Sequence, residues 1–569
     1  MSPRVSRRAF IGGGGALAAG AVATVLAASR DGRSRAPAGP PPGTSPTAAP
    51  TLATTPVSRP RQGGSAAIVS PASLNFDTFD AQLSGSPAVV EILGRTHSRL
   101  LNWNGRGDRT LIGDLAARWE QPDAQTIVFH LDPAARWHDK PPLNGRPLTA
   151  DDVVVHFHRT LALAQEGNAP LAQRYHDYSS VASVDSPAAG QVRFRLGRAD
   201  PFFLGTLAGE YAVVQAPEAV AAFAGLWSRL DSDHVVGTGP WTFDWADDGL
   251  TFAAARTGHR SPYLDELRLS EPHNVADRFL AGHLDEAIVR DRREAAVVRQ
   301  ESSPELFDPR GDINDALQLS GSGRTYEFRR YEHEIVMSSF FVGAPPWNNL
   351  QLVSALSNAL SRADLVERLF AGRAEVSGAI PPGLAPRDAG QSPDGLQSDH
   401  GDDPEGRLNA RRLWVAAGGP GLGPVTIDFP SIFDPLYSAS SIVVGLLNEA
   451  IGPQFRAAVE TYTTISRRVL DGYYGSGRAA FWFGWGPPLP GPDRERYFQE
   501  TYGPGSPGQR ASGGPGTTRD ALGSLANASY SGIVPWVQQY AEVFRRPGHV
   551  AAQPTPFWPQ HLDYVRSNA

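Results

Sequence analysis

The chain has 569 residues, a formal net charge of −7 and a sequence pI near 6.1, and its hydrophobic content is ordinary for a globular protein. This length exceeds what one hydrophobic core supports, so we expect two or three domains. An acidic chain without a basic stripe argues against a nucleic-acid partner. The absence of cysteine excludes disulfides, thiolate catalysis and cysteine-bound metals, and we expect no lipid anchor on an N-terminal cysteine.

The first residues predict an export signal. Arg7 and Arg8, followed by Phe10, precede a weakly apolar run, 12–28, that is rich in glycine and alanine. The pattern is typical of a twin-arginine (Tat) signal over residues 1–35, which carries folded proteins across the bacterial inner membrane. The Tat translocase is therefore an expected partner during export. A chance Arg-Arg pair is one alternative, and an uncleaved signal that tethers the protein to the membrane is another.

A linker follows the signal. Residues 36–64 are dominated by proline, alanine and threonine, and residues 36–60 alone hold eight prolines. Such a segment cannot bury a core, so we expect it to be extended and disordered. Structured sequence is expected to begin near Ser65.

Local patterns in the remaining chain predict strands that alternate with helices. Alternation of Ile127 and Phe129 with more polar neighbours favours a half-buried strand, and Thr149-x-x-Asp152 opens the next helix like a capping box. Alternating strands and helices define an α/β class. The expected strands are 66–69, 126–131, 424–430 and 457–463, with a hairpin in 237–258, and the expected helices are 86–103, 348–372, 409–421 and 440–455.

A short aromatic segment is the strongest candidate for a binding surface. Residues 481–490, FWFGWGPPLP, contain four aromatic residues and no charge, so exposure of the whole segment would invite aggregation. Phe481 and Phe483 alternate with Trp482 as in a buried strand and are expected in the core. Trp485 is expected to line a pocket, because an indole offers a flat surface and one N–H donor.

Five motifs, taken in order, resemble a known family. They are LAARWE at 115–120, WHD with the following NGR and TADDV at 137–153, GTGPW at 237–241, VSALSNALSR at 353–362 and GWG at 484–486. The ordered set resembles the solute-binding proteins of peptide/nickel-type ABC importers (extracellular solute-binding protein family 5, cluster C). The resemblance spans about residues 66–565.

The resemblance implies a two-lobed periplasmic-binding-protein type II fold, joined by two crossing strands and closing like a hinge. It places lobe I at 65–330 with an inserted subdomain at about 92–235, lobe II at 331–544, and a C-terminal return to lobe I at 545–569. It also implies a monomer that works outside the inner membrane, captures an oligopeptide or modified peptide, and delivers it to an ABC permease and ATPase complex. No cofactor, metal or catalytic residue is implied.

The family's Gly-Trp segment faces the ligand cleft, which assigns Gly484, Trp485 and Gly486 to the ligand site. Trp482 is a further candidate ligand-binding residue beside Trp485. Four more candidates are equally compatible with a structural role, and they are Asn75, Trp241, Tyr175 and Tyr178.

One departure from the family bears on the ligand. Peptide-binding members carry an aspartate three residues after this tryptophan, which pairs with the ligand's free amino group, and here that position is Pro488. Proline can neither accept a hydrogen bond there nor balance a cation, so we expect no conventional anchor for a peptide N-terminus. Asp493 could substitute only if the loop is rebuilt. The loss of an arginine at Val353 and an aspartate at Ser361 is interpreted as drift in structural salt bridges.

Other ligands and functions remain open. An uncharged aromatic rim suits a peptide with a blocked amine, a sugar, or an ammonium held by cation–π contact. A signalling or partner role on the same scaffold is a further alternative, and an exported enzyme is the least supported because no nucleophile–base pair is evident. His130, His138, His156 and His158 are interpreted as solvated surface residues rather than metal ligands. The acidic pairs 151–152 and 247–248 are expected to be a helix start and a turn.

Overall fold

The structure, a computed structural model, divides the chain into residues 1–58 and 59–569, and every residue it describes lies in the second unit. The described residues are 62–70, 74, 76–84, 86, 88–103, 111–165, 175–289, 292–301, 317–321, 324–333, 346, 349–370, 374–376, 404–430, 436–461, 464–465, 467–468, 473, 481–482, 537–545, 549–550 and 566–567.

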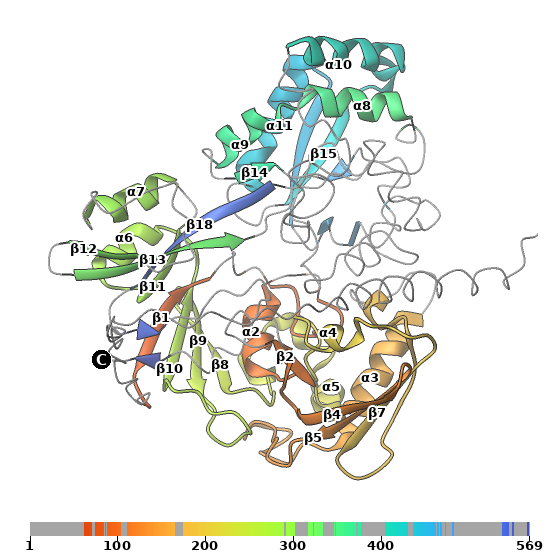
Figure 1. Cartoon of the computed structure of the whole chain (residues 1–569), viewed down its shortest axis with the longest axis vertical. Coiled ribbons are helices and arrows are strands. Elements are labelled where there is room, and N and C mark those ends of the chain that lie inside the picture. The colour runs from red at the N-terminus through yellow and green to blue at the C-terminus, as the bar shows by residue number, and fades with distance from the viewer. Residues whose placement is uncertain are drawn as a thin grey trace, which may run out of the picture. The chain divides into compact units, whose positions relative to one another are not determined.

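The strands form one large mixed sheet and several smaller sheets (Figure 1). The large sheet follows the path β12-β13-β18-β11-β1-β10-β9-β8, with β14 added beside β18. Its strands are β1 (Ser65–Val69), β8 (Trp241–Ala246), β9 (Gly249–Ala254), β10 (Glu266–Ser270), β11 (Glu286–Val289), β12 (Leu317–Gly321), β13 (Arg324–His333), β14 (Ala374–Val376) and β18 (Val537–Arg545).

The centre of the large sheet is parallel. β1 pairs in parallel with β10 on one side and with β11 on the other, through Ile68 opposite Leu269 and Glu286. The carboxyl ends of these three strands therefore lie at one edge, where ligands bind in open α/β sheets. The predicted hairpin in 237–258 is confirmed as β8 and β9, with the acidic pair 247–248 in its turn.

Two long strands connect distant parts of the chain. β18 pairs along most of its length with β13. Its end at Glu542–Arg545 pairs with β11, and its start, residues 537–539, pairs with β14. The resemblance implies two crossing strands, and β13 and β18 are a pair of this kind.

Smaller sheets complete the set of strands. β16-β15-β17 is parallel, and the helix Leu436–Ala450 (α11) makes the crossover from β15 to β16; β4-β5-β7-β6 is antiparallel. The strands β2 and β3 form one two-stranded sheet, and β19 and β20 form another. The bounds are β2 (Leu101–Trp103), β3 (Leu111–Gly113), β4 (Ala116–Asp123), β5 (Thr126–Leu131), β6 (Val181–Asp185), β7 (Gln191–Leu196), β15 (Val425–Pro430), β16 (Phe455–Glu460), β17 (Phe481–Trp482), β19 (His549–Val550) and β20 (Arg566–Ser567).

Helices are present at the predicted positions, but several of them begin or end at other residues than predicted. The helix expected over 86–103 ends at Thr96, because His97 is extended and residues 101–103 form β2. The helix expected over 348–372 is two helices, because Leu360 is extended and Ser361 caps a new helix that begins at Arg362. The bounds are α2 (Val89–Thr96), α3 (Ala150–Gln165), α4 (Phe203–Leu207), α5 (Pro217–Phe223), α6 (Val275–Ala281), α7 (Arg292–Glu301), α8 (Leu350–Ala359), α9 (Arg362–Phe370), α10 (Pro404–Ala416) and the α11 crossover.

Three further elements are shifted toward the N-terminus. The helix expected over 409–421 begins five positions earlier as α10, with a proline in its first position, where the missing N–H costs nothing. The helix expected over 440–455 and the strand expected over 457–463 both lie nearer the N-terminus, as α11 and β16. Gly452 makes the turn between them at φ +138°, a conformation that favours glycine.

The capping box at the start of α3 is confirmed. The Thr149 hydroxyl accepts the Asp152 backbone N–H at 3.3 Å, and the Asp152 carboxylate accepts the Thr149 N–H at 2.9 Å. Arg146 also binds both carboxylate oxygens of Asp152 at 2.8 Å. The predicted helix start is therefore built from reciprocal side-chain bonds.

Among the described residues, the buried apolar side chains form three clusters. The largest lies between the large sheet, the four-stranded sheet and α3. A second joins α8, α10 and α11 to β15 and β16, and a third joins α6, α7 and β11 to Phe544. These separate clusters agree with the expectation that a chain of this length forms more than one hydrophobic core.

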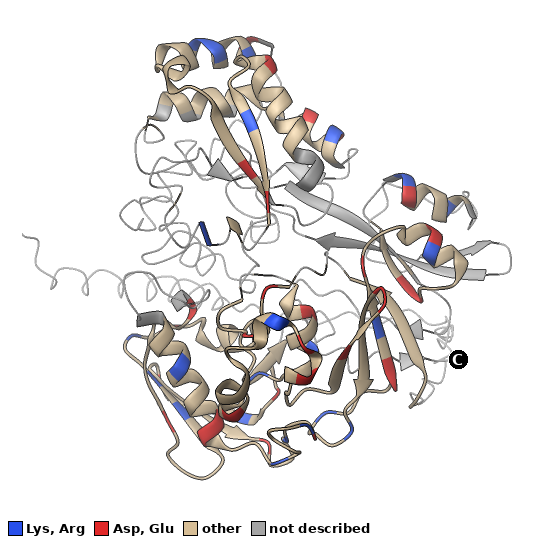
Figure 2. Cartoon of the chain, turned by 180° about the vertical axis from the view of Figure 1, so that it is seen from behind, with Lys and Arg blue, Asp and Glu red and all other residues tan. Residues whose placement is uncertain are grey.

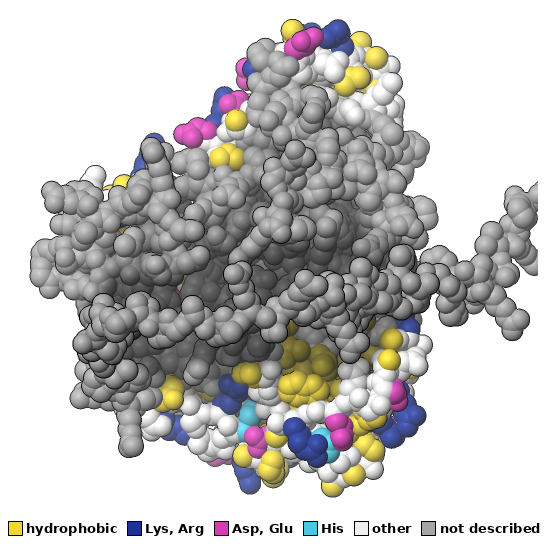
Figure 3. All heavy atoms as spheres, viewed as in Figure 1, with side chains coloured by type: hydrophobic (Ala, Val, Ile, Leu, Met, Phe, Trp, Pro, Cys, Tyr) yellow, Lys and Arg dark blue, Asp and Glu magenta, His cyan; other side chains and the backbone are white. Residues whose placement is uncertain are grey.

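The described surface mixes charges of both signs. Figure 2 shows lysine and arginine interspersed with aspartate and glutamate over the described elements, and Figure 3 shows the same mixture on one face. Within the described ranges, no helix has the length and apolar character needed to cross a membrane.

Candidate functional site

The aromatic segment starts in the small parallel sheet. Phe481 and Trp482 form β17, whose backbone pairs with β15, so that Trp482 lies opposite Asp428. The Gly-Trp residues Gly484, Trp485 and Gly486, together with Pro488, lie outside the described residues, as do Asn75, the signal residues Arg7, Arg8 and Phe10, and the side chains of Trp482 and Tyr175. Their assignment to a ligand site or a signal stays a prediction.

Three charged residues meet at the carboxyl end of this sheet. Asp428 lies in β15, Glu460 ends β16, and Arg468 follows in the chain. The Arg468 guanidinium donates to Asp428 Oδ2 at 2.5 Å and to Glu460 Oε1 at 2.8 Å, and it lies 5.1 Å from the centre of the Tyr473 ring. This Asp428–Arg468–Glu460 cluster places two carboxylates and one guanidinium beside the start of the aromatic segment.

The electrostatics of the cluster follow from burial. The Asp428 side chain is 2 % exposed, whereas that of Arg468 is 25 % exposed. Partial burial by itself lowers the pKa of Arg468, but hydrogen bonds and charges from Asp428 and Glu460 outweigh it and raise that pKa above its ordinary value. The guanidinium therefore stays charged and neutralises the buried carboxylate.

The carboxyl edge of the large sheet carries a second carboxylate. Glu271 follows β10, and both of its carboxylate oxygens accept the Leu74 N–H, at 3.1 and 3.3 Å. Burial raises the pKa of Glu271 against the opposing effects of this bond and of His273. Glu271 thus fixes the chain directly before the predicted ligand residue Asn75.

Trp241 lies in the protein core. It begins β8 and is fully buried, so it does not line an exposed surface in this structure. The preceding glycines explain the motif: a Cβ on Gly237 would lie 1.9 Å from the Thr96 carbonyl oxygen, and one on Gly239 would lie 2.3 Å from that of Arg95. The Gly-Thr-Gly-Pro turn therefore lets the chain pack against the end of α2.

Two of the four histidines expected at the surface are buried, and that expectation was wrong for them. His138 and His156 are 3 % and 5 % exposed. His138 accepts the Gly237 N–H and contacts the Gly239 carbonyl, and His156 accepts the Gln215 N–H. Burial lowers the pKa of His138 to about 4 and that of His156 to about 3. Both are structural acceptors whose burial depends on contacts distant in sequence.

The other two histidines, His130 and His158, make contacts with neighbouring side chains or backbone. His130 lies within hydrogen-bond distance of Glu120 at 2.9 Å and Arg118 at 3.0 Å, and His158 contacts the Val184 carbonyl at 2.9 Å. In the part of the chain that the structure describes, no three His, Asp or Glu side chains come together as a metal ion would need.

Sequence reasoning missed Asp428, Arg468, Glu460 and Glu271. The signal for Asp428 was available, because a carboxylate inside the apolar strand 424–430 must find a partner when the strand is buried. The sequence could not name that partner, because Arg468 lies forty positions away. Glu271 gave no local signal, since its partner is 197 positions distant.

The parallel sheets and the paired strands β13 and β18 agree with the two-lobed α/β fold of solved structures that this chain resembles. The solved dipeptide-binding protein of Pseudoalteromonas sp. SM9913, in complex with Met-Leu, is similar with a TM-score of 0.65 and 16% identity, covering 89% of this chain and 100% of that one. The A. tumefaciens R10 protein MoaA, in complex with mannopinic acid, is similar with a TM-score of 0.63 and 16% identity, covering 90% and 100%.

Sequence comparison gives the family. Residues 110–502 match Bacterial extracellular solute-binding proteins, family 5 Middle, and the chain belongs to this family of binding proteins. A Brucella ovis protein named for peptide binding in an ABC transporter is 25% identical over 279 residues, which are 48% of this chain and 46% of that protein. The chain thus aligns with about half the length of this curated relative.

Proposed function

We propose that this protein captures a solute outside the inner membrane and delivers it to an ABC permease and its ATPase. The family match over residues 110–502 carries the proposal. Closure of two lobes would exclude water from the ligand, so a few polar contacts would determine affinity. No covalent step is part of this function.

We assign an oligopeptide or modified peptide as the first ligand class. The Brucella relative is named for peptides, and the Pseudoalteromonas structure holds a dipeptide. The charge pattern favours a peptide whose amine is blocked. Pro488 stands where peptide-binding members carry the acid. Asp428, which lies opposite Trp482 in the sheet, is already bound by Arg468.

A small non-peptide solute is the second candidate. The A. tumefaciens structure on the same fold holds mannopinic acid. A sugar without an amine would need no carboxylate to anchor it, which agrees with Pro488. A sugar would stack on Trp485, and a cationic solute would need a cation–π contact with Trp482 or Trp485.

Native mass spectrometry of the chain purified from its own host tests the proposal. A ligand that co-purifies adds mass to the folded protein and is lost after mild unfolding. A peptide without a free amine supports the first class, and a non-peptide solute supports the second. A peptide with a free amine would overturn the interpretation of Pro488, and the absence of any adduct would weaken the capture function.

Variants of the aromatic segment locate the bound ligand. We expect Trp485→Ala to reduce the fraction of protein that carries the adduct, because the flat face that contacts the ligand is removed. Trp485→Phe retains an aromatic face and should preserve most of the adduct. Equal adduct fractions in wild type and Trp485→Ala would place the ligand elsewhere.

Export depends on the twin-arginine pair in this proposal. Replacing both Arg7 and Arg8 by lysine should retain the protein inside the inner membrane, because the translocase reads the guanidinium pair and not charge alone. Cell fractionation with an antibody against the folded chain measures this. Unchanged export would contradict a Tat route and leave the binding function untouched.

A further inference from the structure

The Glu271 carboxylate at the carboxyl edge of the large sheet is half-buried and forms no ion pair among the described residues. It directly follows β10, and both of its oxygens accept the Leu74 N–H. Burial raises the pKa of Glu271, so keeping a charged group at this place costs free energy. Carboxyl groups in such surroundings are concentrated at functional sites.

The backbone of Glu271 is fixed from two sides. Its N–H donates to the Asp248 carbonyl at 3.3 Å, in the turn between β8 and β9. Its carbonyl accepts the Arg278 guanidinium of α6 at 3.1 Å, and Arg278 also binds the Asp248 carboxylate at 2.7 Å. The charge of Arg278 is thus directed to Asp248, and the Glu271 side chain extends from a rigid base toward Leu74.

The chain that Glu271 holds at Leu74 is held a second time further along. The Gln215 side chain donates to the Phe79 carbonyl at 2.8 Å and accepts the Ala81 N–H at 3.1 Å. Glu271 therefore fixes the near end of a segment whose far end is fixed independently. Removing the carboxylate should loosen that near end without releasing the whole segment.

A matching contact lies at the opposite edge of the same two strands. Asp265 directly precedes β10, and its carboxylate accepts the Gly64 N–H at 3.1 Å, directly before β1. Arg256 pairs with Asp265, whereas Glu271 has no such cation among the described residues. The uncompensated carboxylate of this pair is thus the one at the carboxyl edge, where ligands bind in open α/β sheets.

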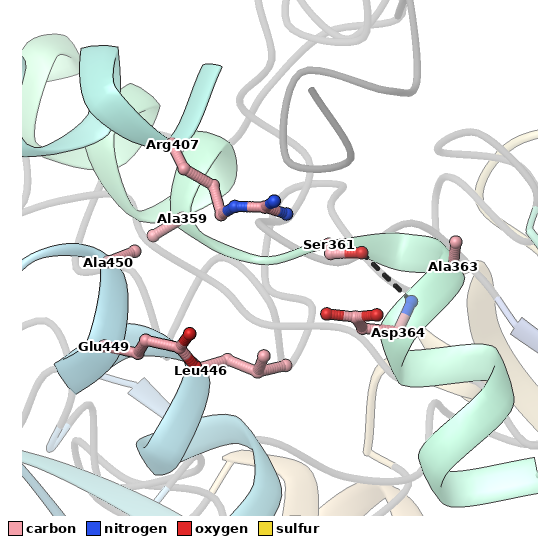
Figure 4. A pocket seen from close by; sticks show the side chains of 8 residues that line it. All are labelled: Ala359, Ser361, Ala363, Asp364, Arg407, Leu446, Glu449 and Ala450. Carbon is pink, nitrogen blue, oxygen red and sulfur yellow. Dashed lines mark hydrogen bonds between the residues drawn. The ribbon is translucent and has the colours of Figure 1, made fainter. Parts of the chain in front are cut away.

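Glu271 also differs from the acidic side chains at a cavity between α8 and α9. This cavity of about 290 Å³ lies beside α10 and α11, and Figure 4 shows Asp364, Arg407 and Glu449 around it. Asp364 lies 3.8 Å from Arg368 in the same helix, and Glu449 is exposed. The charges at this cavity therefore need no ligand to balance them.

We propose that Glu271 is a positioning residue of the ligand site. In the sequence, the candidate ligand residue Asn75 stands between Leu74 and Phe76. By holding Leu74, the carboxylate keeps the chain that leaves β1 ordered before the solute arrives, which reduces the ordering cost of binding. The role rests on the proposed capture function, and Glu271 acts through the chain rather than by touching the solute.

Amide hydrogen exchange in the full chain tests the contact without any ligand. Glu271→Ala removes the acceptor, so the Leu74 amide should exchange at least about fivefold faster than in the wild type. Glu271→Gln keeps an acceptor oxygen and should exchange at about the wild-type rate. A thermal melt checks that both variants fold. Equal exchange in the wild type and Glu271→Ala would overturn the positioning role.

A binding measurement tests the consequence for the captured solute. The probe is the material that the wild-type chain releases on mild unfolding, added back at serial dilutions to the stripped protein. Native mass spectrometry gives the dilution at which half of the protein carries the adduct. Glu271→Ala should need about fivefold more material than the wild type, and Glu271→Gln less than about twofold more.

Asp265→Ala is the matched control, because it removes a carboxylate acceptor from the same strand pair at the other edge. Its half-saturating dilution should stay within about twofold of the wild type. Equal values for the wild type and Glu271→Ala would overturn the positioning role alone. So would a glutamine variant as weak as the alanine variant, because charge would then matter and not the acceptor. A wild type that releases no solute would overturn the capture function, and this role with it.

Discussion

At the scale of single residues, Asp428 shows how this chain accommodates a charge inside a sheet. Its carboxylate is 2 % exposed and lies within 2.5 Å of Arg468. Taking a carboxylate out of water is costly unless a partner of opposite charge stays with it. The same pairing removes Asp428 as a simple anchor for a ligand amine beside the aromatic segment.

Arg468→Met is therefore expected to destabilise the fold. The substitution keeps the aliphatic stem but leaves Asp428 without its guanidinium, which should lower the free energy of unfolding by about 2 kcal/mol. The figure is below that of a fully buried pair because Arg468 is partly exposed. Urea unfolding measures it.

Arg456→Met controls for loss of an arginine, because Arg456 is exposed in β16. It should change the free energy of unfolding by less than about 0.5 kcal/mol. If the two variants were equally stable, the Asp428 pairing would have no measurable role in stability.

Gly237 is a second single residue with a large effect, because its lack of a side chain lets the turn pack against the end of α2. A methyl group there would overlap the Thr96 carbonyl oxygen, only 1.9 Å away. Since that oxygen belongs to the backbone, α2 or the turn must move. We expect Gly237→Ala to lower the free energy of unfolding by about 3 kcal/mol.

Gly225→Ala provides the comparison for a glycine with free space, because a Cβ added at Gly225 would have no atom within 4 Å. Thermal or urea unfolding should show a change below about 0.5 kcal/mol for this variant. A mild effect of Gly237→Ala, close to that of Gly225→Ala, would show that the turn can relax.

At the scale of the element, α3 illustrates a helix start determined by local sequence. Its first backbone N–H groups have no partner within the helix, and Thr149 and Asp152 supply one another's acceptors. Asp152 also binds Arg146, whose guanidinium lies 5.8 Å from the Trp137 ring centre. The start of α3 therefore anchors the preceding loop as well.

Thr149→Ala should destabilise the chain by about 1 kcal/mol, because the Asp152 N–H loses its acceptor. Thr149→Ser keeps the hydroxyl and should remain close to the wild type. Denaturant midpoints at constant slope give the comparison. Equal loss in the alanine and serine variants would point to the threonine methyl group rather than to capping.

At the scale of the whole molecule, the buried histidines His138 and His156 link stability to pH. Burial lowers the pKa of His138 to about 4 and of His156 to about 3, from an ordinary 6.5. Between these values and 6.5 the unfolded chain binds more protons than the folded chain. Stability is therefore present above about pH 6.5 and is lost as the pH falls toward 4.

We expect each histidine to contribute at most about 1.4 kcal/mol per pH unit to this loss. His156→Asn retains an acceptor for the Gln215 N–H but does not titrate, so it should reduce the slope of unfolding free energy against pH between 6 and 4. Chemical denaturation at several pH values measures the slope. An unchanged slope in His156→Asn would contradict the role of this histidine.

Several elements and the family follow from short stretches of sequence. The strand 126–131, the capping box of α3 and the hairpin of β8 and β9 were predicted correctly, because residue alternation, caps and turns act over a few positions. The ordered motifs identified the family in the same way. The interruption between α8 and α9 was missed, because an apolar helical period continues across it while Ser361 caps a new helix.

Local sequence patterns were sufficient to predict the α/β class, the family and the location of most helices and strands. The folded structure was needed to show that Asp428 meets Arg468, that Glu271 holds Leu74, that His138 and His156 are buried, and that four segments enclose the cavity beside Arg407. Local periodicity reports which face of an element is apolar. It does not report which distant residue packs against that face, because this depends on how the chain brings separate elements together.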